Sequence, residues 1–439
     1  MTKGAATGRY LAVEALVRQE QNGYSNLVLD AMLRRSGLEP REKAFASAVF
    51  YGVLERQFTL DWMLAQCLRQ PLARLDAPVR AILRAGLYQA VYMDSVPVSA
   101  AVNESVALTR AFRKASAAGF VNAVLRRAAA QQPDKASFAD PAQALSVKCS
   151  VSLPIARAFL EWYGPEAKSI LAAFFQKPPL ALRANTLRTT PQGLCEALAQ
   201  EGWTAAPGPV PGSVIAEGKG SIVHTKAFEQ GLFHVQGLAS QLACLCLDAK
   251  PGHKTVDACA APGGKSATLA QYMENTGSLW CGELAAARTP LISQTLERLG
   301  ITVGNVRCQD ASEFVPDWQQ ADRVLCDVPC SGLGILAKKP DIRAKRLENQ
   351  PELWQLQAKI LDTCSRYVKQ GGKLVYSTCT LCPDENQRQV EAFLQRHPDF
   401  RLAAPAFVPQ GCIPEGDMLV LRPDQTGFDG FFVATMERL

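Results

Sequence analysis

Two cysteines in this 439-residue chain have neighbours and positions that suit covalent chemistry. Cys330 stands in the run Asp-Val-Pro-Cys-Ser-Gly (327–332), and Cys379 stands in the run Ser-Thr-Cys-Thr (377–380). Each motif follows a short apolar run that is typical of a buried β-strand. Both thiols are therefore predicted just past the carboxyl end of a strand, which is where open α/β sheets bind ligands. This placement favours covalent catalysis by a thiolate.

A glycine-rich turn follows a third strand-like run, Lys254–Asp257, and reads Ala-Cys-Ala-Ala-Pro-Gly-Gly-Lys (258–265). The turn is not the dinucleotide fingerprint G-x-G-x-x-G. It is not a Walker loop either, because Cys259 stands where that loop needs its first glycine. Pro262 and the two glycines after it force a tight turn and let a ligand approach the backbone closely. We therefore predict that this turn binds a cofactor beside the two thiols.

Three acidic residues follow successive strand-like runs beyond this turn: Glu283, Asp310 and Asp327. Glu283 comes about 20 residues after the glycines, where nucleotide-binding sheets carry the acid that binds a ribose diol. Asp310 is placed to accept a hydrogen bond from an adenine amino group. Each of the three, taken alone, is more simply read as a helix N-cap or a solvated turn residue. Together they favour a ligand that contains a nucleoside.

The composition is that of a globular protein with more than one domain, since 48% of the residues are hydrophobic and 20% are charged. No run approaches the roughly 18 apolar residues of a membrane helix, and residues 1–10 lack the apolar segment of a signal peptide. We expect a cytoplasmic protein with no membrane partner, and therefore no disulfide framework among its 14 cysteines. Five cysteines lie in or beside apolar runs and are predicted to be small buried residues: Cys244, Cys246, Cys281, Cys308 and Cys326.

The net positive charge of the chain is confined to its first third. Residues 1–140 hold 18 Lys and Arg against 12 Asp and Glu, whereas the remaining residues hold 29 of each. Apolar residues in this part repeat at helical spacing, which predicts an all-α domain. The charge is compatible with a module that binds a polyanion and with a domain that is merely soluble. Arg80 and Arg84 lie four residues apart on one helix face and are candidate phosphate contacts, although a solvated surface is the simpler interpretation for each.

Changes in pattern predict three parts. The polar residues 130–135 form a linker that ends the helical domain, which we assign to residues 1–140. A small α+β segment is predicted over residues 141–235, because helical runs there precede a strand-like run at 180–186. From residue 236 to residue 439 strands and helices alternate, which is typical of a parallel α/β sheet.

The cysteine motifs and the glycine turn together resemble a known family. Residues 257–265, 327–332 and 377–380 are similar to motifs of the S-adenosylmethionine-dependent RNA cytosine-C5 methyltransferases. The helical first third resembles the NusB-like RNA-binding domain, and this combination is typical of the bacterial RsmB/Fmu type within the NOL1/NOP2/Sun family. The resemblance covers nearly the whole chain. It implies a multidomain fold with an all-α NusB-like N-terminal domain, a small α+β RNA-binding or linker segment, and an α/β Rossmann-like methyltransferase domain. Three further family segments are matched by residues 183–188, 235–241 and 427–432.

The resemblance implies methyl transfer from S-adenosylmethionine to carbon 5 of a cytosine in 16S ribosomal RNA, either free or early pre-ribosomal. Cys379 would add to carbon 6 of the base, which makes carbon 5 nucleophilic. Cys330 would help to remove the proton from carbon 5 or to release the enzyme after transfer, and Asp327 would hydrogen-bond the edge of the cytosine. The enzyme would be a monomer without a metal. The residues implied to hold the cofactor are Cys259, Ala260, Ala261, Pro262, Gly263, Gly264, Lys265, Glu283, Asp310 and Asp327.

Alternatives remain open on the sequence alone. The same chemistry could act on transfer RNA or on 23S ribosomal RNA, and the chain could be a non-catalytic ribosome-assembly factor that binds RNA. Retention of Cys330, Cys379 and Asp327 argues against loss of catalysis. Cys379 and Cys382 form a C-x-x-C motif that suits a redox pair or half of a zinc site, but no second such pair exists. Ala344 stands where the family has a tryptophan, and alanine cannot provide the stacking contact that a tryptophan would make there.

Overall fold

The computed structural model describes residues 7–22 and 25–439, and the chain divides into two compact units. The first unit contains Met1–Leu171 and Lys338–Leu347, and the second contains Ala172–Ala337 and Glu348–Leu439. The three-part division at residues 140 and 235 stays a prediction. Residues 1–6, which belong to the stretch expected to lack a signal peptide, lie outside the described part of the chain. No helix within the described ranges is both long and apolar enough to span a membrane.

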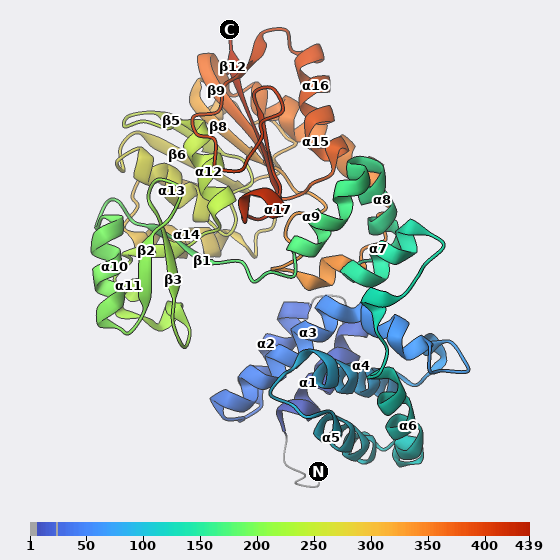
Figure 1. The fold of residues 1–439 in the computed structure, drawn as a ribbon. Helices are drawn as coiled ribbons and strands as arrows, with labels where there is room; N and C mark the ends of the chain where they lie inside the picture. Colours follow the sequence, from blue (N-terminus) through green and yellow to red (C-terminus); the bar gives the residue numbers. More distant parts are fainter. Residues whose placement is uncertain (1–6, 23–24) are drawn as a thin grey trace. The chain divides into compact units, whose positions relative to one another are not determined.

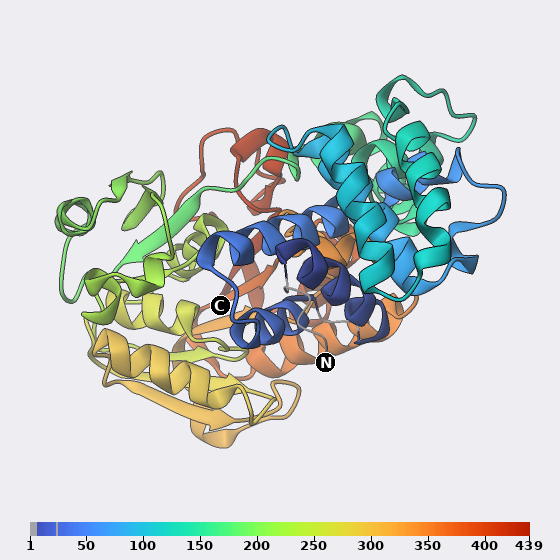
Figure 2. The same ribbon diagram turned by 90° about the horizontal axis from the view of Figure 1, so that it is seen from below.

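The first unit is built from helices, as the spacing of its apolar residues predicts. Helices coloured blue to cyan lie against one another in both views (Figures 1 and 2). Pro40 and Pro78 stand in the first turn of α3 and α4, where their missing N–H groups cost no helical hydrogen bond. Phe50, Leu60 and Ile82 are fully buried in the common core. The helices are α1 (Gly8–Asn22), α2 (Ser25–Arg35), α3 (Pro40–Ala65), α4 (Ala77–Tyr92), α5 (Val98–Ala111), α6 (Ala118–Ala128), α7 (Pro141–Cys149), α8 (Leu153–Tyr163) and α9 (Ala167–Ala173), the last of which runs into the second unit.

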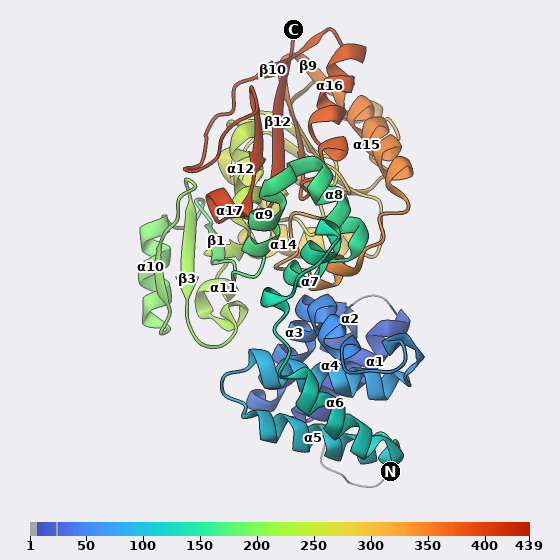
Figure 3. The same ribbon diagram turned by 45° about the vertical axis from the view of Figure 1, so that its right-hand side comes forward.

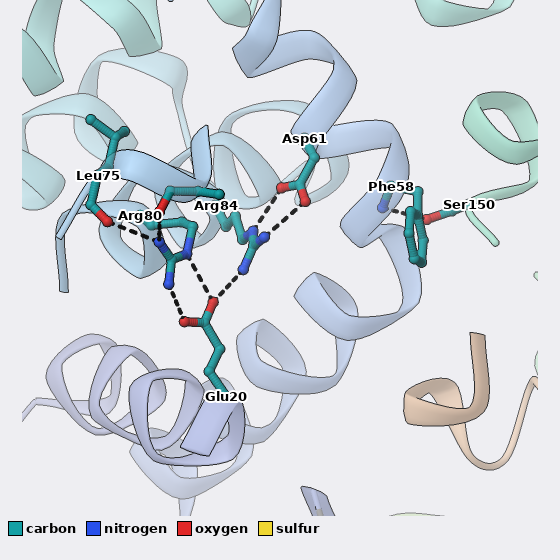
Figure 4. A network of polar contacts seen from close by, with 8 residues as sticks. Glu20, Phe58, Asp61, Leu75, Arg80, Arg84 and Ser150 are labelled. Carbon is teal, nitrogen blue, oxygen red and sulfur yellow. Dashed lines mark hydrogen bonds and ion pairs between the residues drawn. The ribbon is translucent and has the colours of Figure 1, made fainter. Parts of the chain in front are cut away.

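An ion-pair network joins helices α1, α3 and α4 (Figure 4). Arg84 donates two hydrogen bonds to Asp61, at 2.7 and 2.8 Å, and a third to Glu20 at 2.6 Å. Arg80 donates to the same Glu20 carboxylate. Two acids balance the two arginines, and Arg84 is buried. The prediction that this arginine pair faces a phosphate is therefore corrected, because the guanidinium groups tie helices together.

Residues 338–347 leave the second unit in sequence and belong to the first, and we call them the strap. Arg343 is completely buried there and donates from Nη1 to the carbonyl oxygen of Cys149 at 2.9 Å. Ser152 donates from its backbone N to the carbonyl of Arg343 at 2.8 Å and from its hydroxyl to the carbonyl of Lys345 at 2.6 Å. Burial lowers the pKa of Arg343 to about 10. The helical unit is thus completed by a segment that follows it by more than 160 residues.

The second unit begins with a small antiparallel sheet whose strand order is β2-β3-β1-β4. Its core includes the fully buried Leu182, Leu194 and Phe233. Thr190 caps helix α10 by accepting a hydrogen bond from the backbone N of Gly193. The elements are β1 (Leu180–Ala184), α10 (Pro191–Gln200), β2 (Thr204–Pro207), β3 (Ser213–Glu217), α11 (Lys226–Glu229) and β4 (Phe233–Val235).

A larger sheet follows, with the order β10-β12-β9-β8-β5-β6-β7 and β11 paired to β12. Strands β5 to β9 are parallel, and β10 to β12 pair antiparallel at one side. Helix α12 lies on one face, and α15 and α16 lie on the other (Figures 1 and 3). The chain runs outward from β5 through β6 to β7 and then returns to β8 on the opposite side of β5. Ligands bind at such a topological switch point.

Strands β5 to β9 fall on the strand-like runs that precede the glycine turn, the acids and the two thiols in the sequence. The strands are β5 (Lys254–Asp257), β6 (Ser278–Glu283), β7 (Gly304–Cys308), β8 (Ala321–Asp327), β9 (Val368–Thr378), β10 (Phe400–Ala403), β11 (Met418–Leu421) and β12 (Phe431–Arg438). The helices are α12 (Leu238–Leu247), α13 (Gly264–Tyr272), α14 (Thr289–Leu299), α15 (Gln350–Ser365), α16 (Gln387–Arg396) and α17 (Pro423–Thr426).

The cysteines predicted to be buried are buried with one exception. Cys244, Cys246, Cys281 and Cys326 have at most 1% of their surface exposed. The prediction for Cys308 is wrong, because this thiol is exposed. Cys308 ends β7, which is the last strand of the sheet and pairs only with β6. An edge strand leaves part of its residues uncovered, whatever their hydrophobicity.

Candidate active site

The two cysteine motifs meet at the carboxyl edge of the large sheet. Strands β8 and β9 are parallel neighbours, and their register places Asp327 opposite Ser377. The two loops that follow therefore start side by side, and Cys330 Sγ lies 3.2 Å from Cys379 Sγ. Both thiols are partly exposed. The structure thus brings together two residues that are 49 positions apart in the sequence.

Close backbone contacts fix these two loops. Gly334 donates from its backbone N to the carbonyl of Cys379 at 3.0 Å, and Gly430 donates to the carbonyl of Gly334 at 2.7 Å. A Cβ atom at Gly334 would lie 1.9 Å from the carbonyl oxygen of Gly430, so no larger residue fits there. The segment 427–432, which resembles a family motif, therefore packs its backbone against the loops that carry the thiols, and we call this contact the backbone wall.

Asp327 is held between a hydroxyl group and an ammonium group. Ser377 Oγ donates to Asp327 Oδ1 at 2.7 Å, and Lys265 Nζ lies 2.7 Å from Asp327 Oδ2. Burial opposes the charge on Lys265, but Asp327 outweighs it and raises the pKa of Lys265 above its usual range. Lys265 was predicted to hold a cofactor. The structure places it against Asp327, a partnership that the sequence did not indicate.

The glycine turn joins β5 to α13 at the switch point. Asp257 is completely buried, accepts a hydrogen bond from Ser266 Oγ at 2.6 Å, and has its pKa raised to about 6 by burial. Gly263 has a φ of +101°, a left-handed conformation that favours glycine. Burial raises the pKa of Cys259 well above its usual range, so this third thiol stays neutral. Cys259 is therefore a poor nucleophile.

The acids Glu283 and Asp310 occupy the ends of β6 and β7. Glu283 is 6% exposed, and its Oε1 accepts from the backbone N of Ala285 at 3.0 Å and from Arg288 Nη1 at 3.3 Å. Arg288 Nη2 also donates to the carbonyl of Ala261 at 3.2 Å. Arg288 thus links the acid to the glycine turn. Its position five residues after Glu283, at the start of a helix, is a signal that the sequence reading missed.

An exposed leucine extends this part of the site. Leu284 follows Glu283 and is 68% exposed, which is high for a large apolar side chain beside a buried acid. Asp310 Oδ1 accepts a hydrogen bond from the backbone N of Ser312 at 2.8 Å. Glu283 and Asp310 lie at the ends of neighbouring strands, and two carboxylates with an exposed apolar side chain form a set that can bind a purine nucleoside.

The C-x-x-C motif has an asymmetric structure. Cys382 is completely buried, and burial raises its pKa, whereas Cys379 is partly exposed and has the thiol of Cys330 beside it. This arrangement does not favour Cys382 as the redox partner of Cys379. Within residues 7–22 and 25–439, no cluster of three or more His, Cys, Asp or Glu side chains is placed to hold a metal ion.

Comparisons with known proteins find matches along the whole chain. The model of the 16S rRNA methyltransferase RsmB/F matches residues 244–437, the NusB family model matches 6–130, and the RsmF/B-like ferredoxin-like domain matches 155–222. The probable ribosomal RNA small subunit methyltransferase B of Bacillus subtilis strain 168 is 33% identical, with 98% of each chain covered. The ribosomal RNA small subunit methyltransferase B of Pseudomonas putida is 31% identical, with 92% of each chain covered.

Solved structures share the fold. PH0851 superposes with a TM-score of 0.82 over 99% of both chains at 24% identity. A methyltransferase homolog protein from Pyrococcus horikoshii superposes with a TM-score of 0.62 at 26% identity, over 69% of this chain and 100% of its own. The predicted order of an all-α NusB-type domain, a small α+β domain and a Rossmann-like methyltransferase domain is confirmed by these matches.

Proposed function

Since this chain belongs to the RsmB/F family of 16S rRNA methyltransferases, we propose that it methylates carbon 5 of a cytosine in that RNA. The observation that carries this proposal is the pair of thiols, Cys330 and Cys379, which lie 3.2 Å apart in the loops that follow the paired residues Asp327 and Ser377. Carbon 5 of cytosine is too electron-poor to take a methyl group unless a nucleophile first adds to carbon 6. The form we propose is a cytoplasmic monomer that acts on free or early pre-ribosomal RNA.

We propose that the two cysteines divide the work. The hydrogen bond with Cys379, and then burial, raise the pKa of Cys330 well above its usual range. Either sulfur can donate in this contact, and we infer that Cys330 is the donor and Cys379 Sγ the acceptor. This hydrogen bond stabilises negative charge on Cys379, which is what a nucleophile requires. We assign the nucleophile to Cys379 and assistance in release to Cys330.

The covalent steps balance as follows. Cys379 Sγ bonds to carbon 6, and the electron pair of the C5–C6 double bond moves to carbon 5, which takes the methyl group. The proton on carbon 5 then leaves to a base, the C6–S bond breaks, and the double bond and the Cys379 thiolate are restored. Cys330 is next to the sulfur that must leave, which places it to assist this last step. The target base must leave its stack to reach the thiols.

Asp327 and Lys265 would orient the base. Each oxygen of Asp327 already accepts one interaction, from Ser377 and from Lys265, and an ionised carboxylate has further lone pairs free. These can accept a hydrogen bond from the exocyclic amino group of cytosine. Lys265 keeps Asp327 oriented while the adduct forms.

The residues at the ends of β5, β6 and β7 fit S-adenosylmethionine. Both hydrogen bonds to Glu283 end on Oε1, which leaves Oε2 for a ribose hydroxyl. Leu284 offers an apolar surface to the adenine, and Asp310 offers a carboxylate to its amino group. The turn 259–265 would approach the amino-acid end of the cofactor. When bound, the cofactor supplies an electrophilic methyl group.

The test is methyl transfer from labelled S-adenosylmethionine to 16S rRNA, 23S rRNA and transfer RNA, with 5-methylcytosine mapped in the products. Modification at a discrete cytosine of 16S rRNA is the expected result. Methylation of transfer RNA or 23S rRNA instead would support the proposed chemistry and show that the proposed substrate is wrong. Cofactor binding without transfer to any of the three RNAs would favour the non-catalytic assembly factor.

A further inference from the structure

Two adjacent buried residues hold both cysteine loops, and neither belongs to the site described above. Building on the proposed function, we propose that Glu385 and Asn386 are positioning residues that set Cys330 and Cys379 against each other. We call them the Glu385–Asn386 pair. They form the turn that leads into α16, and they are 0% and 1% exposed.

Asn386 holds the loop of Cys379 from both sides. Thr378 Oγ1 donates to Asn386 Oδ1 at 2.5 Å, and Asn386 Nδ2 donates to the carbonyl of Thr380 at 3.0 Å. The two partners are the residues immediately before and after Cys379. One carboxamide therefore fixes the backbone that carries the nucleophile, with both its acceptor and its donor satisfied.

Glu385 holds the loop of Cys330 in the same manner, with the help of Gln357. Ser331 donates from its backbone N to Glu385 Oε2 at 2.8 Å. Gln357 Nε2 donates to the same oxygen at 2.9 Å and to the carbonyl of Pro329 at 2.9 Å. Pro329 and Ser331 are the residues immediately before and after Cys330.

Two further bonds make one assembly of the two loops. Ser331 Oγ and Thr380 Oγ1 lie 2.7 Å apart, which joins the Cys330 loop directly to the Cys379 loop. Tyr376 donates from its hydroxyl to the carbonyl of Glu385 at 2.7 Å and fixes the turn to strand β9. The Sγ–Sγ separation is therefore determined by bonds that converge on a single turn.

The burial of Glu385 is unfavourable in free energy, which argues against a role in packing alone. Its carboxylate takes part in no ion pair among the described residues, and Oε1 has no hydrogen-bond partner. A carboxyl group that is buried without a cation beside it is less well solvated than in water. An apolar residue would fill this volume at lower cost, but it could not accept the backbone N–H of Ser331. The carboxylate thus serves the loop that carries Cys330.

The consequences for the two thiols are separable. Asn386→Ala removes the bonds around Cys379, so attack on carbon 6 should slow by about 100-fold, with KM for RNA unchanged. Glu385→Ala removes a bond beside Cys330, so attack should persist while release slows, and a protein–RNA adduct should accumulate. Glu385→Gln should restore near wild-type behaviour, because a single oxygen, Oε2, accepts both bonds.

The experiment compares these variants in the full-length enzyme. RNA that carries 5-fluorocytosine traps the Cys379 adduct, because no proton can leave carbon 5, and its rate of formation is read by denaturing electrophoresis. The rate of the release step is obtained from turnover on normal RNA and from the amount of adduct that accumulates during it. Asp384→Ala is the matched control, since the side chain of this neighbouring acid pairs with Arg388 instead. Thr378→Val, which removes one of the two Asn386 bonds, carries the test if Asn386→Ala does not fold.

The outcomes distinguish the two proposals. No trapped adduct and no transfer by the wild-type enzyme would reject the proposed function. If the wild-type enzyme is active, the rates of adduct trapping decide the role of Asn386. Trapping by Asn386→Ala and Thr378→Val at the rate of Asp384→Ala would reject the positioning role of Asn386. Normal release by Glu385→Ala would reject that of Glu385. A Glu385→Gln enzyme as impaired as Glu385→Ala would also contradict the role, because the accepting oxygen would not be what matters.

Discussion

Cys330 and Cys379 have similar surroundings but opposite expected consequences on mutation. Cys379→Ala removes the atom that we propose bonds to carbon 6, so methyl transfer should fall by about 10³-fold or more. The side chain is small and partly exposed, so the fold and cofactor binding should survive. Initial rates with labelled cofactor, together with a melting curve, check both expectations. Transfer at the wild-type rate would reassign the nucleophile.

Cys330→Ala should slow the first bond-forming step without preventing it, because Cys379 loses the thiol beside it, and should impair the last step most. We expect a protein–RNA species that survives denaturing electrophoresis and appears only when S-adenosylmethionine is present. The wild-type enzyme, which completes release, and the double variant with Cys379→Ala, which cannot form the adduct, are the controls. If Cys330→Ala gives no such species, the release role assigned to this residue is wrong.

At the scale of elements, the contact between α1 and α4 is predicted to depend on pH. Burial raises the pKa of Glu20, but Arg80 and Arg84 outweigh it and lower the pKa below its ordinary value of 4.5. The stabilisation of the fold by the charged Glu20 is therefore complete above pH 4.5. It is lost as the pH falls through the lowered pKa of Glu20 in the folded protein. Glu20 is exposed to solvent, which weakens its ion pairs, so the free energy of unfolding of Glu20→Gln should be lower than that of the wild type by about 1 kcal/mol at pH 7. Denaturant curves should show this difference shrink below pH 4.5; a constant difference would contradict the assignment.

Much of the fold was predictable because local patterns decide it. The bounds of β5 coincide with the strand-like run Lys254–Asp257 seen in the sequence. Strand order is not local, which is why the exposure of Cys308 on an edge strand was missed. The same limit applies to Arg84, whose partners Glu20 and Asp61 come from two other helices.

The site was predictable to the level of strand ends. Parallel strands bring their carboxyl ends to one edge, so Cys330 and Cys379 were expected near the glycine turn. Their contact at 3.2 Å requires β8 and β9 to be adjacent, and the pairing of Lys265 with Asp327 requires β5 beside β8. Neither adjacency can be read from spacing. The roles of these residues in binding and catalysis stay predictions until they are measured.

For the molecule as a whole, the strap predicts that the helical unit is incomplete without residues 338–347. A fragment of residues 1–171 should be less stable than the same region in the full chain, because it lacks the buried Arg343. A peptide with the strap sequence, added in excess, should raise the melting temperature of the fragment, since a ligand that binds the folded state stabilises that state. The same peptide with Arg343→Ala should not. Equal shifts from both peptides would mean that Arg343 is not the anchor.

The excess positive charge of residues 1–140 gives a second prediction at this scale. Arg126 and Arg127 are exposed at the end of α6, unlike Arg84. If this unit contacts RNA phosphates through them, the double change to alanine should weaken RNA binding. It should also reduce the slope of log affinity against log salt by about 1–2. An unchanged slope would show that these two arginines are not RNA contacts.

Strand β12 has a consequence for how the enzyme is made. It is the last strand in chain order, yet it pairs with β9, where Phe432 lies opposite Thr378, and the neighbouring Gly430 bonds to Gly334 behind the thiols. On a translating ribosome, β8 and β9 emerge well before this partner does. A nascent chain that already contains both thiols therefore lacks the wall that fixes them. Competence for methyl transfer should thus appear only after residue 438 has left the exit tunnel.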